Sequence, residues 1–182
     1  MISSLSSQSF TTYTVDTSTN TSVFTNWDSD VDIDVLWPTK GYSPSSSAND
    51  ESIVLKVTYG GKSILLMGDA SSTVETQLIS LYGSSVLNCD ILKIGHHTSN
   101  GSSSANFLTA CSPSYAIASF TVNSSYGWPG SSTVSRLISA GLVGWKTSSN
   151  SGKMYGTSYH GNIDVTISAS GAITITTERT YS

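Results

Sequence analysis

The sequence predicts an α/β fold of the α+β kind, in which a mixed sheet carries its helices on one face. Two short apolar segments, residues 63–67 and 91–95, have the length of buried strands, and a segment with helical spacing of apolar residues separates them. A strand pair joined by Gly60-Gly61 precedes this unit. Further strands close the chain, so both antiparallel and parallel pairs are expected in the sheet.

The chain of 182 residues fits one domain, with Ser/Thr/Asn-rich residues 1–30 as an N-terminal extension or edge strands. Only 11% of the residues are charged, the net charge is -4, and the 8 Lys and Arg residues are scattered. Tight binding of a nucleic-acid backbone by this chain alone is therefore not expected, because it needs clustered cations. The composition fits an extracytoplasmic or cell-surface location at least as well as a cytosolic one. No apolar run is long enough to span a membrane, and the first residues lack the blocks of a signal peptide.

The first strand is expected at residues 31–36, where apolar and acidic side chains alternate. Asp32 and Asp34 then lie on the exposed side of an edge strand, where charge opposes pairing with another chain. Trp37-Pro38 ends the strand, and the turn-forming residues of 39–50 predict a loop.

A hairpin and a helix follow. Strands at 52–59 and 63–67 flank the tight turn, and the uninterrupted apolar character of the second strand predicts burial on both faces. A helix is expected from Thr73 to about Tyr82. The spacing of Ser72 and Glu75 is that of a capping box, and Gly83 is expected to end the helix.

The rest of the chain predicts alternating strands and helices and then a β-meander. Helices are expected at 104–110 and at 132–140, the second with Val134, Leu137 and Ile138 facing inward. Strands are expected at 91–95, 115–120, 142–146, 163–167 and 172–176. The last two strands are joined at 169–171 by a hairpin signal.

Polar side chains follow the two central strands. Asp69 comes after residues 63–67, and His96 and His97 come after residues 91–95, in a chain with only 3 histidines. If the strands are parallel neighbours, their ends lie about 5 Å apart, and Asp69 and one histidine could bind one zinc, manganese or iron ion. The other histidine would point to the opposite side and could orient substrate or transfer a proton. The alternative is that these residues only shape two turns.

Several blocks resemble the metallo-β-lactamase-fold domain of ComEC-type competence proteins and its stand-alone relatives; the phosphorylcholine esterases are more distantly similar. The blocks are residues 49–56, 62–69, 90–99 with 102–104, and 123–129. The resemblance extends from about Val31 to Thr176. It implies an αββα sandwich with a two-metal site at the sheet edge.

The resemblance also implies roles for the residues in these blocks. Asp69 matches the carboxylate that bridges the two metal ions, and His96 or His97 matches a histidine ligand. His97 and Ser99 are the candidate catalytic residues, Ser99 as a residue that shapes the loop or contacts substrate. Zinc or manganese is the implied cofactor, held at a two-metal site in the complete fold and weakly or not at all by this chain alone. Bridging metals activate water for attack on a phosphoryl or acyl group.

The chain departs from the family pattern in three places. The His-x-His-x-Asp-His motif of the N-terminal half is absent, since His160 is the only other histidine. Thr98 stands where the family usually has glycine, and Trp128 where it often has histidine. The chain therefore resembles the C-terminal half of the fold, and its expected partner is the missing N-terminal half, from the same precursor or a separate chain.

Two functions follow from this resemblance. The first is part of a metal-dependent hydrolase that acts on a phosphodiester or related ester, with a small phosphoester or a nucleic acid as substrate. The alternative is a binding or assembly module that keeps the scaffold and has lost the metal site.

Outside the site, His160 is expected in an exposed turn. Cys89 and Cys111 are expected to be buried free thiols, with a single disulfide between them as the alternative.

Overall fold

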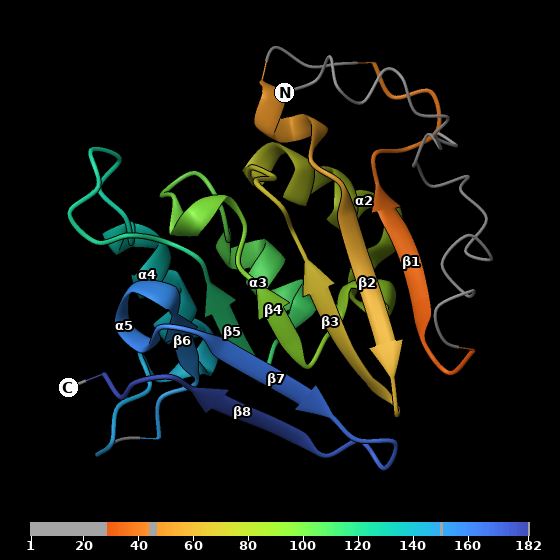
Figure 1. Cartoon of the computed structure of the whole chain (residues 1–182). Helices are drawn as coiled ribbons and strands as arrows, with labels where there is room; N and C mark the ends of the chain where they lie inside the picture. The colour runs from red at the N-terminus through yellow and green to blue at the C-terminus, as the bar shows by residue number, and fades with distance from the viewer. Residues whose placement is uncertain (1–28, 44–46, 150, 182) are drawn as a thin grey trace, which may run out of the picture.

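The computed structural model describes residues 29–43, 47–149 and 151–181, and the expected edge strands within residues 1–28 lie outside it. Six strands form one mixed sheet in the order β1-β2-β3-β4-β5-β6, and β7 pairs with β8 in a separate hairpin (Figure 1). The elements are β1 (Asp32–Trp37), η1 (Ala48–Glu51), β2 (Val54–Tyr59), β3 (Lys62–Leu66), α2 (Ser72–Leu87), β4 (Ile91–Lys93), η2 (His96–Thr98), α3 (Ala105–Cys111), β5 (Tyr115–Ala118), α4 (Ser131–Leu137), η3 (Ile138–Leu142), β6 (Met154–Gly156), α5 (Thr157–His160), β7 (Ile163–Ile167) and β8 (Ile173–Thr177). The predicted α+β class with a mixed sheet is confirmed.

The N-terminal side of the sheet is antiparallel, as expected. β1 is the edge strand, and Asp32 and Asp34 are exposed while Ile33 and Val35 are buried. β2 and β3 form the predicted hairpin, with Tyr59 opposite Lys62. Both glycines of its turn have positive φ, 56° and 71°, as a two-residue turn that follows the strand twist requires.

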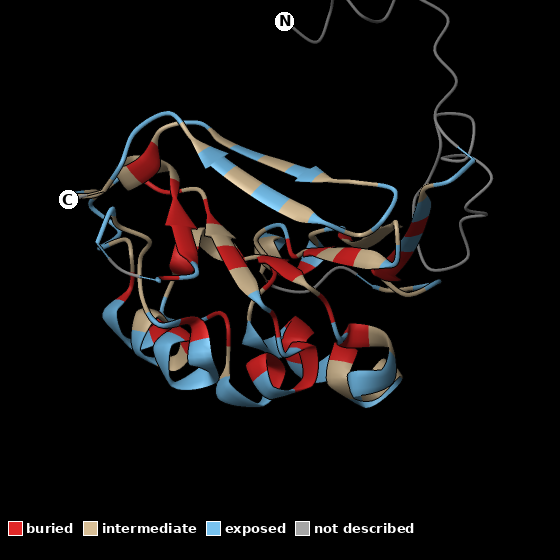
Figure 2. Cartoon of the chain, turned by 90° about the horizontal axis from the view of Figure 1, so that it is seen from below, coloured by how far each residue is buried: buried red, intermediate tan, exposed pale blue. Residues whose placement is uncertain are grey.

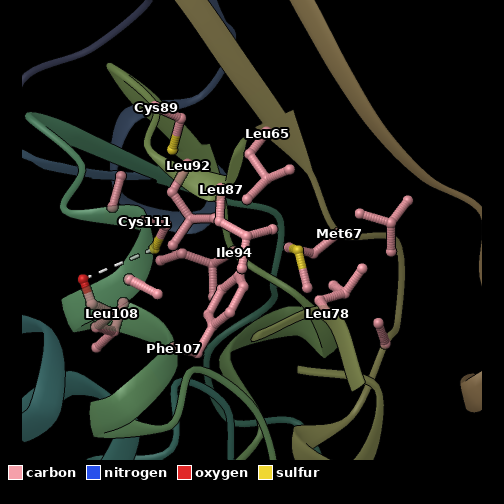
Figure 3. Close-up of a cluster of buried hydrophobic side chains, with 14 of the residues drawn as sticks. Leu65, Met67, Leu78, Leu87, Cys89, Leu92, Ile94, Phe107, Leu108 and Cys111 are labelled. Atoms are coloured by element: carbon pink, nitrogen blue, oxygen red, sulfur yellow. Dashed lines mark hydrogen bonds between the residues drawn. The ribbon is translucent and has the colours of Figure 1, made fainter. Parts of the chain in front are cut away.

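The centre of the sheet is parallel, because helices connect β3, β4 and β5. α2, α3 and α4 lie on one side of the sheet and the β7–β8 hairpin on the other (Figure 2). Leu65, Leu92 and Ala116 point to the helical side and are fully buried. There they pack with α2 and α3, where Leu78 and Phe107 are also buried (Figure 3). None of the described helices is long and apolar enough to cross a membrane.

The start and end of α2 differ from the prediction. Ser71, not Ser72, caps the helix by accepting a hydrogen bond from the Thr73 amide. The chain turns through a non-helical conformation at Gly83 but resumes helical structure as far as Leu87. Glu75 is not part of a capping box, because its buried carboxylate binds a different segment.

Within the residues that the structure describes, the β7–β8 hairpin lies over the second face of the sheet (Figure 2). Val165 and Ile175 pair across the hairpin, and its apolar side chains are half-buried while the alternating ones are exposed. In β3, Leu65 is buried whereas Ile64 and Leu66 are half-buried, so the predicted burial of this strand on both faces is wrong. The predicted terminal meander is also wrong, since β7 and β8 form an isolated pair.

Several C-terminal elements differ from the sequence prediction. Residues 142–146 do not form the expected strand: a π-helical turn runs to Leu142, and the next residue is left-handed. Ile138 is 48% exposed and not inward-facing. β6 and α5 were not predicted, and η1 lies within the expected loop 39–50. Each of these elements spans only three to five residues, which is too short to show a period in the sequence.

Candidate functional site

The site lies where β3 and β4 end at one edge of the sheet. The strands are parallel, with Leu66 aligned to Lys93, so the segments that follow them leave the sheet side by side (Figure 1). The His96 amide donates a hydrogen bond to the Gly68 carbonyl at 3.1 Å. A Cβ at Gly95 would lie 3.0 Å from the Ala70 carbonyl oxygen, so glycine allows the two segments to approach closely.

Asp69 and His97 face each other across this edge. Their Oδ1 and Nε2 atoms are 3.4 Å apart. His97 Nδ1 lies 2.7 Å from the Ser119 carbonyl oxygen and must donate to it, because a carbonyl only accepts. In the neutral ring this bond leaves Nε2 as an electron-pair donor directed at the carboxylate side.

This pair fits one edge of a metal site. Two ligands at about 2.0–2.2 Å from a tetrahedral zinc ion are about 3.4 Å apart. A carbonyl that binds the remote imidazole nitrogen is the usual way in which a protein orients a histidine ligand. Among the described residues, however, no three His, Cys, Asp or Glu side chains lie close enough to hold a metal ion. The pair is therefore at most a partial ligand set.

His96 points elsewhere. Its Nε2 lies 3.4 Å from Nδ2 of Asn49, which belongs to η1, and its ring centroid is 6.4 Å from that of His97. The two imidazole rings therefore point in different directions: His96 lies by Asn49, and His97 lies by Asp69. The backbone at His96, His97 and Thr98 has φ of 46°, 53° and 65°, which is unusual for three successive residues other than glycine.

Ser99 shapes the loop that follows the histidines. Its hydroxyl accepts a long hydrogen bond of 3.4 Å from the Gly101 amide. Its carbonyl accepts hydrogen bonds from the Thr133 and Ser102 hydroxyls, at 2.7 and 3.0 Å. These contacts give Ser99 a structural role.

A buried carboxylate fixes the far end of the same loop. Glu75 is 1% exposed and accepts hydrogen bonds from the amides of Ser103 and Ser104, the second at 2.8 Å. Burial raises the pKa of Glu75, and its hydrogen bonds and the positive charge of Arg136 oppose that rise. Arg136 holds the loop from outside through the carbonyls of Ser103 and Ser102, both at 2.8 Å. This anchor could not be predicted from the sequence, since nothing in a helical glutamate shows that its partners are 28 and 29 residues away.

Aromatic side chains form one wall of the site. The ring of Trp128 lies 4.5 Å from that of His97 and stacks on Tyr126 at 4.8 Å, with an interplanar angle of 19°. Tyr126 is 76% exposed, so the stack extends from solvent to the imidazole. A cavity of about 270 Å³ lies beside it, lined by His97, Trp128 and Ser119, among others. Such a wall suits a planar ring in a ligand.

Lys93 adds a positive charge near the carboxylate. It is the last residue of β4 and is half-buried. Burial lowers the pKa of Lys93, while the charge of Asp69 opposes that change. The ammonium group also donates a hydrogen bond to the Ile94 carbonyl at 3.2 Å.

His160 is not the exposed turn residue that the sequence suggested. It is 1% exposed at the end of α5. Nε2 lies 2.8 Å from the Lys146 carbonyl oxygen, and Nδ1 lies 3.0 Å from the Gly156 amide nitrogen. His160 therefore holds the C-terminal segments together and does not take part in the site at the end of β3 and β4. Cys89 and Cys111 are buried free thiols, as predicted.

Comparisons with known proteins find relatives of part of this chain. No protein-family model matches the chain. Competence protein ComA of Neisseria gonorrhoeae is 36% identical over 116 residues, which cover 64% of this chain and 16% of that protein. The chain is related to competence proteins. ComE operon protein 3 of Bacillus subtilis (strain 168) is 34% identical over 84 residues, 46% of this chain and 11% of the relative.

A third relative is the uncharacterized protein YcaI of Escherichia coli (strain K12). It is 36% identical over 83 residues, 46% of this chain and 11% of that protein. The chain thus spans less than a fifth of the length of each of these relatives.

Proposed function

We propose that this chain is the C-terminal part of a metallo-β-lactamase-fold hydrolase domain with a role in competence, acting on a phosphodiester or related ester. The observation that carries the proposal is the 3.4 Å approach of Asp69 Oδ1 and His97 Nε2 at the edge of the sheet. The similarity to competence protein ComA and to ComE operon protein 3 supports it.

In this proposal Asp69 and His97 are metal ligands, and zinc or manganese is the metal. A bound metal of this kind supplies an activated water and stabilises negative charge on the substrate. Ser119 orients the His97 ring through its carbonyl. Trp128 and Tyr126 would hold a planar group of the substrate beside the imidazole.

The remaining ligands would come from the N-terminal half of the fold, in the same polypeptide or in a separate chain. The described residues offer no third ligand at this edge, so a complete metal site needs another source of ligands. The half-buried face of the sheet, with Leu55, Ile64 and Leu66, provides an apolar surface for that half to cover.

A hydrolysis assay tests this proposal. The chain would be produced joined to the preceding part of its reading frame, loaded with zinc or manganese, and assayed with bis(p-nitrophenyl) phosphate. We expect Asp69→Ala and His97→Ala each to lower the rate at least about a hundredfold, since a lost ligand removes charge stabilisation in the transition state. Asp34→Ala, which changes an exposed carboxylate on the edge strand, is the matched control. Equal rates for Asp69→Ala and the control would refute the proposal.

The second candidate is a binding or assembly module that has lost the metal site. Trp128 favours it, because an indole that packs on the His97 ring cannot ligate a metal. The coding sequence upstream of Met1 separates the two candidates. If the reading frame continues upstream and encodes a His-x-His-x-Asp-His motif, the hydrolase is supported. If no such motif is encoded there, the binding module is supported.

A further inference from the structure

A second cavity lies away from the Asp69–His97 pair, between the end of β1 and the first turns of α2. Its volume is about 360 Å³, within the range of about 300–1,000 Å³ of small-molecule sites. Trp37 and Tyr42 supply aromatic rings to its lining, with centroids 4.7 Å apart, and Val74 and Leu81 supply apolar side chains. Asp50 supplies a carboxylate.

Asp50 is unusual in this setting. It is 7% exposed, and its Oδ1 accepts a hydrogen bond of 2.5 Å from the Ser71 hydroxyl. Within the described part of the chain the recorded ion pairs are Lys62–Asp90 and His97–Asp69, so Asp50 has no cationic partner there. The nearby start of α2 offers only about half a positive charge, which leaves the carboxylate incompletely neutralised.

The segments outside the described residues add no basic side chain. Residues 1–28 and 44–46 contain no Lys, Arg or His. A buried charge without a counter-charge is costly, and a pocket that combines it with aromatic rings is suited to a cation from outside.

We propose that this cavity binds an alkylammonium group. The ammonium would donate to the Asp50 carboxylate and lie against the rings of Trp37 and Tyr42, and the alkyl chain would pack on Val74 and Leu81. The group could belong to a free amine or to a lysine side chain of another protein. The proposal does not depend on hydrolysis at the Asp69–His97 pair.

The test is a titration of the isotope-labelled 182-residue chain, followed by two-dimensional NMR. Butylammonium is the first probe, 1-butanol is its neutral counterpart, and a lysine residue blocked at both ends represents a protein side chain. We expect butylammonium to shift amides of residues 37–42 and 71–77 in a saturable way. Butanol should bind at least tenfold more weakly. Stronger binding of the blocked lysine than of butylammonium would identify a protein as the source of the group.

Variants locate the charge. Asp50→Asn keeps an acceptor for Ser71 but loses the negative charge, and we expect about tenfold weaker binding of butylammonium. Tyr42→Leu should weaken binding about threefold and serves as a second probe should Asp50→Asn not fold. Asp34→Asn, an exposed aspartate on β1, should bind as the parent does. Equal binding of butanol and butylammonium, or unchanged binding by both Asp50→Asn and Tyr42→Leu, would overturn the proposal.

Discussion

Glu75→Gln tests whether one buried carboxylate fixes the loop that carries the histidines. Glu75 accepts hydrogen bonds from two consecutive amides, Ser103 and Ser104, and is 1% exposed. Glutamine has nearly the same volume but only one acceptor oxygen, so one of the two amides must meet an NH₂ group. No cavity forms, and the effect therefore reports on the hydrogen bonds.

The magnitude follows from these contacts. A hydrogen bond to a charged group contributes about 1.5–3 kcal/mol, and a buried amide without a partner costs about 1–3 kcal/mol. Part of this loss is offset in the variant, because the neutral glutamine avoids the unfavourable burial of a charge. The raised pKa of Glu75 indicates that this burial is unfavourable. We expect Glu75→Gln to lower the free energy of unfolding by about 1–3 kcal/mol.

The pH dependence has a defined sign. The pKa of Glu75 is raised above its ordinary value of 4.5 in the folded protein, so the folded state holds the proton more tightly than the unfolded state does. The contribution of Glu75 is then complete below pH 4.5 and declines as the pH rises through the folded-state pKa. The stability difference between the parent and Glu75→Gln should therefore be larger at acidic pH than at neutral pH.

Urea unfolding at several pH values measures both effects, and NMR shifts of the Ser103 and Ser104 amides show whether the loop moves. Glu51→Gln, which changes an exposed glutamate in η1, is the control and should stay within about 0.5 kcal/mol of the parent. A Glu75→Gln protein as stable as the parent, with unchanged loop amides, would refute the anchoring role.

Three further predictions concern packing. Gly130→Ala should lower the free energy of unfolding by about 1–3 kcal/mol, since a Cβ there would lie 2.5 Å from Asn100 Oδ1 and 2.7 Å from the Thr98 carbonyl oxygen. Gly101→Ala is the control, because a Cβ there would have no atom nearer than 3.9 Å. Equal losses for the two variants in urea unfolding would contradict this prediction. His160→Ala should lower the free energy of unfolding by about 2–4 kcal/mol, because it removes two hydrogen bonds of a buried side chain and leaves a cavity. Asn162→Ala, which changes an exposed side chain, is the control in thermal unfolding. A His160→Ala protein that loses no more stability than this control would contradict the prediction. Cys89 and Cys111 are both buried, and the hydrogen bond to Cys89 and burial raise the pKa of the Cys111 thiol. Neither thiol should therefore react with a chromogenic disulfide at pH 8 until urea unfolds the chain. Rapid labelling of the folded protein would contradict this prediction.

The sequence predicted best where local chemistry decides the structure. Gly60-Gly61 can form only a tight turn between two strands, and the alternation of Asp32, Ile33, Asp34 and Val35 defines an edge strand with one buried face. The meeting of Asp69 and His97 followed from a parallel arrangement of two strands connected by a helix. Only the structure shows that His97 and not His96 faces Asp69, because this depends on the left-handed backbone at both histidines.

Prediction failed where the partners are distant in sequence. Glu75 fits a capping box by spacing, but Ser103 and Ser104 bind its carboxylate instead. His160 appeared to lie in a turn before Gly161, yet Lys146 and Gly156 enclose it. β6 was missed because its three residues pair with β5 only after the chain returns from α4.

The central claim is that Asp69 and His97 bind one metal ion, and a cobalt(II) titration of the 182-residue chain followed by NMR tests it most directly. Cobalt(II) can replace zinc with N and O ligands, and its paramagnetism broadens nearby signals. We predict that the signals of Asp69 and His97 are the first to broaden, and broaden together, as cobalt is added, before those of buried His160. Asp69→Asn should weaken the binding seen at His97 at least about tenfold. Broadening centred on His96 alone, or binding at His97 that Asp69→Asn leaves unchanged, would contradict the claim.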